Sequence, residues 1–277
     1  MARMKTMISD LCKMLVLLVL FGFPVSGMAQ TRIEGHVVNE HGEDVEYASV
    51  RIDSFYVVSD QKGHFQMNLP KGEKAEMVIS HLSYKPFVVA YGSYKDGNVK
   101  AVMKENVSNL AEVSVSGKKL KEKKISHKGI KTPGDVTFRN VKNTTYEVGP
   151  IVANKKDFLV KSFNFQIKKC SFSYCVIRVI VYEIKDKGLV PIQSKPIYLK
   201  FTDKLQKEEY SVKPVENLML KKGHDYYVGV AVVSSNGDGE IHFPAFLRKG
   251  YVRNLISGKM KKLPATLGIS MTGVEVQ

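Results

Sequence analysis

The sequence predicts an all-β protein built from two β-sandwiches. Short segments with alternating apolar residues are separated by turns rich in glycine and aspartate, such as 60–63 and 236–239. Hydrophobic residues make up 44% of the 277-residue chain and charged residues 25%, the balance of a globular protein with a buried core. Trp is absent, and the 13 Tyr and 13 Phe often stand beside Val and Ile, as is typical of strands.

Residues 1–29 have the features of a secretory signal. Basic residues precede the short apolar run Met14–Phe23, and small residues place a cleavage site after Ala29. The run is short for a membrane span, and a retained helical anchor is the alternative. We therefore expect an exported protein whose first residue is Gln30.

Residues 31–116 contain seven short segments that alternate as strands do. Val50 and Ile52 point to one face of a sheet and Arg51 to the other, which predicts a sheet with one solvated face. Gly42 and Gly63 lie in polar turns, where a positive φ favours glycine. The predicted strands are Arg32–Val38, Ala48–Asp53, His64–Leu69, Ala75–Leu82, Pro86–Tyr91, Val99–Met103 and Ala111–Ser116.

The spacing of residues in this region resembles that of a known family. The pattern reads Ile33-x-Gly35-x-Val37, Gly42, Ala48-x-Val50-x-Ile52 and Ser59-Asp60-x-x-Gly63-x-Phe65, and it continues through Val78–Tyr84, with Ser83 where glycine is usual. Together these residues resemble the carboxypeptidase-like regulatory domain, a transthyretin-like seven-stranded sandwich. The resemblance implies an accessory module rather than a peptidase.

Leu110–Val115 resembles the segment that joins such domains to the plug of TonB-dependent outer-membrane receptors. Only about 160 residues follow, too few for a plug and a large barrel. The resemblance therefore implies a secreted two-domain bacterial protein related to the N-terminal extension of those receptors. We expect it in the periplasm or at the outer membrane or cell surface.

Residues 117–131 contain seven lysines and one glutamate, which predicts a solvated, flexible basic linker over 117–145. The alternative is a tether for peripheral association with the outer membrane or with an acidic partner. The net charge of +15 favours anionic partners such as lipopolysaccharide, acidic polysaccharide or an acidic protein face, or serves solubility alone. Export argues against nucleic acid as a partner.

Residues 146–277 resume the strand pattern and predict a second, jelly-roll-like sandwich. The alternation slips at Lys161-Ser162, which predicts a β-bulge. Cys175–Ile184 is almost continuously apolar, as in a strand buried on both faces or covered by loops. The predicted strands are Asp157–Lys168, Cys175–Ile184, Lys195–Thr202, Glu209–Lys213, Asp225–Ser235, Glu240–Leu247 and Thr266–Val276.

Cys170 and Cys175 flank a four-residue segment that reads as a hairpin loop. Facing cysteines on paired strands would suit a disulfide, with Cα atoms about 5.5 Å apart. Two buried free thiols are the alternative.

Candidate ligand contacts are the aromatic pairs Tyr226-Tyr227 and Phe243-x-x-Phe246, with core packing as the alternative. We find no motif for catalysis, for a cofactor or for a metal site. The sequence thus predicts an exported, non-enzymatic cell-envelope binding or assembly protein with a glycan or protein ligand. The alternatives are a polysaccharide-active hydrolase, whose paired carboxylates can lie far apart in sequence, and a periplasmic structural subunit that pairs through edge strands.

Overall fold

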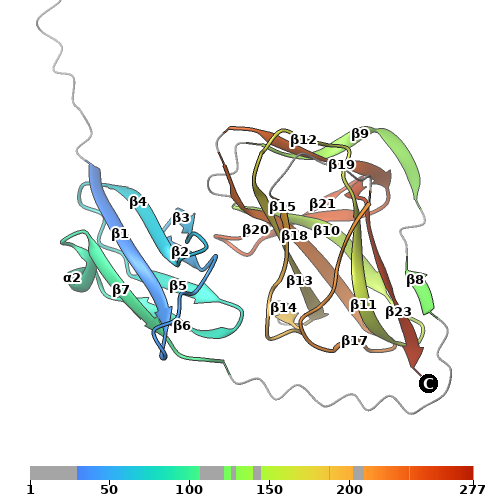
Figure 1. Cartoon of the computed structure of the whole chain (residues 1–277), viewed down its shortest axis with the longest axis horizontal. Helices are drawn as coiled ribbons and strands as arrows, with labels where there is room; N and C mark the ends of the chain where they lie inside the picture. Colours follow the sequence, from blue (N-terminus) through green and yellow to red (C-terminus); the bar gives the residue numbers. More distant parts are fainter. Residues whose placement is uncertain are drawn as a thin grey trace, which may run out of the picture.

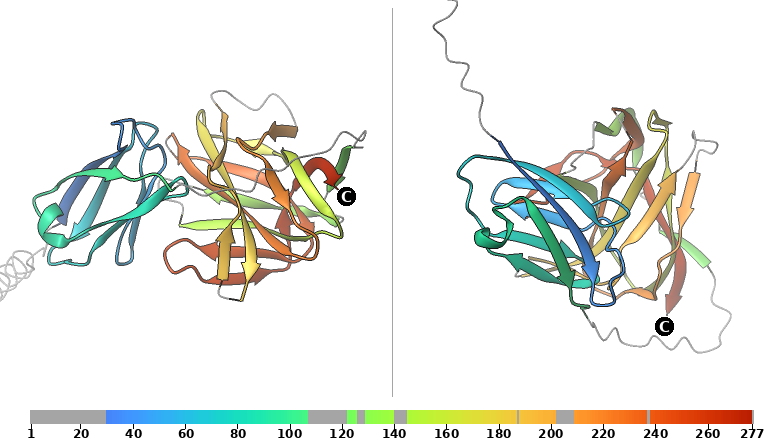
Figure 2. Two further views of the ribbon diagram at one scale, coloured as in Figure 1. Left: turned by 90° about the horizontal axis from the view of Figure 1, so that it is seen from below. Right: turned by 60° about the vertical axis from the view of Figure 1, so that its left-hand side comes forward.

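The computed structural model describes residues 30–106, 122–125, 129–139, 145–186, 188–201, 209–236 and 238–276. Their secondary structure is almost entirely β, and two sandwiches lie side by side (Figure 1), in contact when seen from below (Figure 2). The predicted secretory signal, its cleavage site after Ala29, and the predicted strand Ala111–Ser116 fall outside these ranges.

The first sandwich has seven strands in two sheets, as predicted. One sheet has the order β4-β1-β7, with β1 antiparallel to β4 and parallel to β7, and the other has the order β3-β2-β5-β6. The elements are β1 (Gln30–Asn39), β2 (Ser49–Ile52), β3 (Phe55–Val58), β4 (His64–Pro70), β5 (Met77–His81), β6 (Tyr84–Val89), the short helix α2 (Tyr91–Tyr94) and β7 (Asn98–Met103). The sequence did not predict β3, and the predicted strand Ala111–Ser116 lies outside the described residues, so it is not among these seven.

Two glycines of the family-like pattern are needed where the backbone or a ring comes close. A Cβ on Gly35 would lie 2.4 Å from the ring of Phe65, which packs in the core. Gly63 has φ +71, and a Cβ there would lie 2.3 Å from the Val37 carbonyl oxygen. The Asp60 carboxylate accepts the N–H groups of Lys62 and His64 and so closes the turn before β4.

The second sandwich has three sheets around one core. Its largest sheet has the order β14-β13-β18-β10-β20-β21, and β15 also pairs with β13. The opposite layer contains two smaller sheets. One has the order β16-β11-β23-β8, with β17 beside β11, and the other has the order β12-β19-β22, with β9 beside β19. The strands are β8 (Glu122–Ile125), β9 (Ile130–Arg139), β10 (Tyr146–Ala153), β11 (Asp157–Gln166), β12 (Lys169–Cys170), β13 (Cys175–Lys185), β14 (Gly188–Pro191), β15 (Ile197–Phe201), β16 (Glu209–Val212), β17 (Leu218–Leu220), β18 (Asp225–Ser235), β19 (Glu240–Leu247), β20 (Gly250–Asn254), β21 (Met260–Leu263), β22 (Thr266–Leu267) and β23 (Ile269–Val276).

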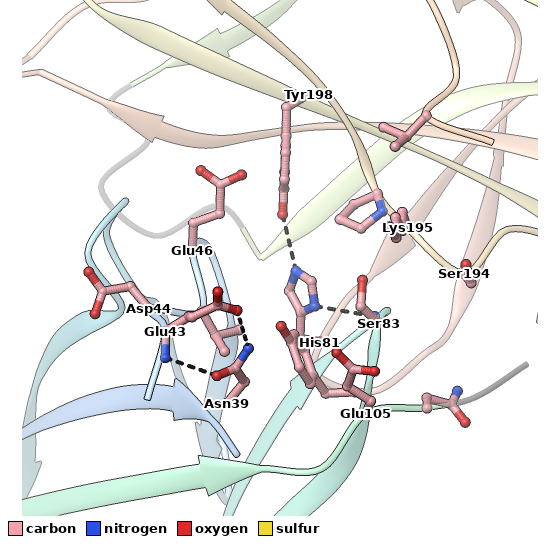
Figure 3. Close-up of a pocket in the computed structure, with 15 residues that line it drawn as sticks. Asn39, Glu43, Asp44, Glu46, His81, Ser83, Glu105, Ser194, Lys195 and Tyr198 are labelled. Carbon is pink, nitrogen blue, oxygen red and sulfur yellow. Dashed lines mark hydrogen bonds between the residues drawn. The ribbon is translucent and has the colours of Figure 1, made fainter. Parts of the chain in front are cut away.

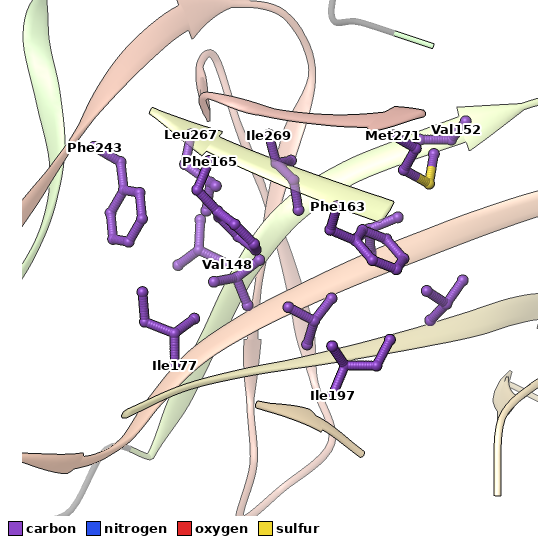
Figure 4. Packing of buried hydrophobic residues seen from close by; sticks show 14 of the residues in the cluster. Val148, Val152, Phe163, Phe165, Ile177, Ile197, Phe243, Leu267, Ile269 and Met271 are labelled. Carbon is purple, nitrogen blue, oxygen red and sulfur yellow. The ribbon is translucent and has the colours of Figure 1, made fainter. Parts of the chain in front are cut away.

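Aromatic and branched side chains fill the space between these layers. Phe163, Phe165 and Phe243 are fully buried and point into the cluster shown in Figure 4. The register of β11 against β23 shifts between Val160 and Ser162, which confirms the predicted bulge.

The prediction of a linker over 117–145 is wrong where the structure describes that segment. β8 extends a sheet by pairing with β23, and the ten residues of β9 pair along β19. The charge count missed this because the lysines of β8 reach carboxylates on other strands: Lys123 Nζ lies 2.6 Å from Glu275, and Lys124 Nζ lies 2.9 Å from Glu209. Residues 107–121, 126–128 and 140–144 fall outside the described ranges, so the tether stays a prediction.

β13 is buried on both faces, as its apolar sequence predicted. Ile177 and Val179 belong to the core of the second sandwich, whereas Val176 packs in a separate cluster with Tyr47 of the first sandwich. The covering element is therefore the first sandwich rather than loops.

In the described part of the chain, no helix is long and apolar enough to cross a membrane.

Candidate functional site

The candidate functional site is the cleft between the two sandwiches. Two pockets, of 610 and 510 Å³, open there, and residues of both sandwiches line each of them. His81, at the end of β5, lines both pockets. Ligand sites occur preferentially at such interfaces between domains, where two surfaces can supply different groups.

Tyr47 anchors the two walls of the cleft to each other. Its side chain is fully buried, and its hydroxyl lies 2.9 Å from the hydroxyl of Tyr174 in the second sandwich. Its ring meets that of Tyr198 edge to face at 5.0 Å. The backbone φ of Tyr47 is +56, in the left-handed region that costs a non-glycine residue energy. Packing between the sandwiches therefore holds Tyr47 in place and fixes the shape of the cleft.

The larger pocket, called the acidic pocket here, is lined by four carboxylates of the first sandwich: Glu43, Asp44, Glu46 and Glu105. Lys195 of the second sandwich lines the same pocket (Figure 3).

Three of the four carboxylates already have partners in the structure. These pairs are Glu43 with Asn39 Nδ2 at 2.7 Å, Asp44 with His36 Nε2 at 2.8 Å, and Glu46 with Lys200 Nζ at 2.8 Å. Proton transfer by a pair of carboxylates needs two groups free to face a substrate. Only Glu105, of these four, lacks a side-chain partner among the described residues.

His81 forms the boundary between the two pockets. Its Nδ1 accepts the backbone N–H of Ser83 at 3.2 Å, so its Nε2 carries the proton toward the Tyr198 hydroxyl at 3.4 Å (Figure 3). Burial and, to a smaller extent, the positive charge of Arg178 together lower the pKa of His81 to about 4. The imidazole is therefore neutral at pH 7.

The smaller pocket, called the arginine pocket here, is lined by Arg51 of β2, Arg178 of β13 and Arg253 of β20. Its lining includes no aspartate or glutamate. Arg178 is only 8% exposed, and no described residue accepts a hydrogen bond from its guanidinium. Burial opposes the charge of Arg178 and the nearby Glu147 charge raises its pKa against that cost, but the N–H donors of Arg178 still need an anion or water to complete their bonding.

A single buried carboxylate sits beside the arginines. Glu147 of β10 accepts a hydrogen bond from Arg253 Nη1 at 2.9 Å and one from the Tyr182 hydroxyl at 3.3 Å. The Arg253 guanidinium also stacks 4.9 Å from the centre of the Tyr182 ring. Gly229 makes room for the carboxylate, because a Cβ there would lie 2.8 Å from it. The three guanidinium groups thus outnumber the carboxylates, and the pocket can accept an anion.

Residues 33–115 match the family model of the CarboxypepD_reg-like domain. The first sandwich is a CarboxypepD_reg-like domain. This domain supplies Arg51 and His81, and the second sandwich supplies Arg178 and Arg253. The predicted relation to TonB-dependent receptors stays a prediction.

No curated protein matches the chain. Among solved structures, a variant of BcpA, the major pilin subunit of Bacillus cereus, is 9% identical, covers 86% of this chain and 69% of its own, and has a TM-score of 0.20. A carbohydrate-binding module of the beta-sandwich superfamily is 9% identical, with 85% and 98% covered and a TM-score of 0.20. These likenesses are too distant to carry an argument about function.

The aromatic residues predicted as ligand contacts are mostly core residues. Tyr226, Tyr227 and Phe243 are buried, and Phe246 on β19 is half-buried. The Tyr227 hydroxyl donates to the Glu147 carbonyl at 3.1 Å, inside the sandwich. The prediction is wrong for the three buried residues, because alternation along a strand does not tell which face is covered.

The two cysteines do not lie on strands that pair with each other. Cys170 on β12 pairs with Ile241, and Cys175 on β13 pairs with Ser235, so the predicted hairpin is wrong. Both are free thiols, and a hydrogen bond from Cys175 lowers the pKa of the Cys170 thiol. A disulfide between them stays a prediction.

Sequence reasoning did not find the arginine pocket. One signal was available: Arg178 interrupts the apolar run of β13 with a charge that burial on both faces would have to accommodate. Arg51 gave no such signal, since an outward charge on an alternating strand is usually solvated.

Proposed function

We propose that this protein is an exported, non-enzymatic binding or assembly protein of the cell envelope, and that its glycan or protein ligand binds in the cleft. The observation that carries the proposal is that both sandwiches line both pockets of the cleft. A site assembled in this way exists only while the two domains are packed together. The CarboxypepD_reg-like domain then acts as one wall of the binding site.

The chemistry of the acidic pocket supports binding over hydrolysis. Glu43, Asp44 and Glu46 are already bonded to neighbouring side chains, which suits holding the wall in shape. In the ranges that the structure describes, no three histidine, cysteine or carboxylate groups are placed to hold a metal ion. The walls offer hydroxyl, amide and charged groups, which suit a polar ligand such as a glycan or a peptide.

Export is tested separately from binding. We expect the full chain, expressed in a Gram-negative bacterium, to be recovered from the envelope fractions with Gln30 at its N-terminus by mass spectrometry. Recovery of the intact chain in the cytoplasm would contradict the proposal.

Binding is tested with a glycan array and with capture of partners from envelope extracts. The variant Ser83→Trp places a large side chain in the acidic pocket, and Ser93→Trp places the same side chain at an exposed position of helix α2 as a control. We expect a glycan or envelope partner that Ser83→Trp loses and Ser93→Trp keeps. Binding that both variants keep would place the ligand elsewhere, and release of shortened glycans would contradict a non-enzymatic role.

A further inference from the structure

We propose that Arg51, Arg178 and Arg253 form a binding site for an oxyanion group of the ligand, such as a carboxylate, a sulfate or a phosphate. This inference rests on the proposed function, because the arginine pocket is part of the same cleft, and it adds the chemical class of the ligand. The pocket has a volume of 510 Å³ and lies between β2 and β5 of one sandwich and β13 and β20 of the other.

Arg178 is the strongest reason for this assignment. More than nine-tenths of it is buried, it lines the pocket, and no described residue accepts a hydrogen bond from it. A guanidinium presents five N–H donors in a planar fork, and that fork matches the paired oxygens of a carboxylate, sulfate or phosphate. An oxyanion in the pocket would satisfy donors that the folded chain leaves open.

Arg253 provides a second set of donors next to the first. Its Nη1 is bonded to Glu147, but its Nε is buried without a partner. Stacking on Tyr182 holds the guanidinium in a fixed plane. The buried Nε does not face the pocket, so Nη2 is the donor that remains for a ligand.

Arg51 completes the site from the opposite wall. It lies on β2 between Tyr56 of β3 and Val78 of β5, and all three line the pocket. It is half-buried and has no ion pair among the described residues. An anion held between Arg51 and Arg178 would therefore contact both sandwiches at once.

The charge balance of the pocket also favours an anion. Its lining contains three arginines and no carboxylate, and a single neighbouring carboxylate, Glu147, bonds to Arg253 and also stabilises the charge of Arg178. The positive field reaches His81, whose pKa is lowered to about 4, mainly by burial and further by Arg178. Ser80 lines the same space and can bind the polar part of a ligand that carries the anion, whereas the hydroxyls of the neighbouring Ser49 and Ser257 are bonded to Tyr56 and Asn254.

The test uses the full chain and isothermal titration with sodium glucuronate, sulfate and phosphate, at constant ionic strength, with glucose as the neutral probe. We expect one-site binding of at least one anion and none of glucose. Glucuronate alone would assign a carboxylate, and sulfate or phosphate alone would assign a tetrahedral group. Binding of none of the three anions would overturn the inference.

The variant Arg51→Gln removes one donor fork from the edge of the pocket, where no described side chain depends on it. We expect its affinity to fall about tenfold to a hundredfold, the loss typical of a charge-assisted hydrogen bond. Lys100→Gln removes the same charge from an exposed position on β7, and we expect no change. Equal losses in the two variants would assign the binding to general surface charge and overturn the inference.

Arg178→Met separates binding from folding. Replacing a buried cation that makes no hydrogen bond to the described residues by an apolar side chain should leave the melting temperature of the ligand-free protein unchanged or higher. Binding should be lost, so that the anion no longer raises the melting temperature. If Arg178→Met fails to fold, Arg51→Gln decides. A ligand that binds equally with and without its charged group would overturn this inference and leave the proposed function standing.

Discussion

Replacing Tyr47 with alanine should uncouple the two sandwiches. Its side chain is fully buried against residues of the second sandwich: Val176, Ala231 and Val233. Its hydroxyl is bonded to Tyr174 across the same interface. Tyr47→Ala removes these contacts while it keeps the Cβ that the left-handed backbone must accommodate, so the backbone strain stays the same.

The size of the effect follows from burial. Truncating a fully buried aromatic side chain to alanine typically costs about 3–5 kcal/mol, which includes the cavity that remains. Tyr47→Phe removes only the bond to the Tyr174 hydroxyl and should cost about 1 kcal/mol. The difference between the two variants measures the packing of the ring.

Differential scanning calorimetry can detect the uncoupling. We expect one cooperative unfolding transition for the wild type and for Tyr47→Phe, and two transitions for Tyr47→Ala, because most of the lost contacts join the sandwiches. Tyr94→Ala is the control: Tyr94 is equally buried but packs within the first sandwich, so this variant should weaken that domain without the same loss between domains. A loss below about 1 kcal/mol for Tyr47→Ala would refute the reasoning.

Three further predictions concern the second sandwich. Hydrogen bonds, led by the one from Lys169, lower the pKa of Glu240 to about 2, and a hydrogen bond from Lys168 lowers the pKa of Asp135. Because both folded pKa values lie below the unfolded ones, the stability that these carboxylates add is present above about pH 4.5 and is lost as the pH falls toward 2. Hydrogen exchange of β9, measured across this pH range, will show the loss. In the reduced protein, Cys170 should react with an alkylating reagent near neutral pH, and the buried Cys175 should react only after unfolding. If the protein is isolated in the oxidised form, a mass lower by two hydrogens would support the disulfide. Gly149→Ala should lower the free energy of unfolding, measured by chemical denaturation, by about 1–3 kcal/mol or more, because the new Cβ would lie 1.7 Å from the Val228 carbonyl oxygen. An unchanged denaturation midpoint would contradict the tight pairing of β10 with β18.

Alternation along single strands predicted most of the first sandwich and the bulge of β11, because it reports directly on which side chains face a core. It missed β3, which follows β2 after a turn in which Asp53 has φ +47. That hairpin carries no glycine, so the sequence lacks the usual turn signal.

Contacts between distant segments could not be predicted in the same way. The lysines of β8 look solvated until Glu275 and Glu209 are placed opposite them. Likewise, period-2 alternation assigns Arg51 to an outward face but does not reveal that a second sandwich covers that face. The arginine pocket depends on three strands that are brought together only by the packing of two domains.

The central claim is that one ligand site is formed by both sandwiches. Hydrogen exchange with mass spectrometry, on the full chain with and without the anion that binds best, tests it most directly. We predict that the anion slows exchange in peptides from both walls, those containing Arg51, Ser80 and Arg253, while β7 and β23 on the far sides stay unchanged. Slowed exchange in one sandwich alone, or only in the lysine-rich segment 117–131, would contradict the claim.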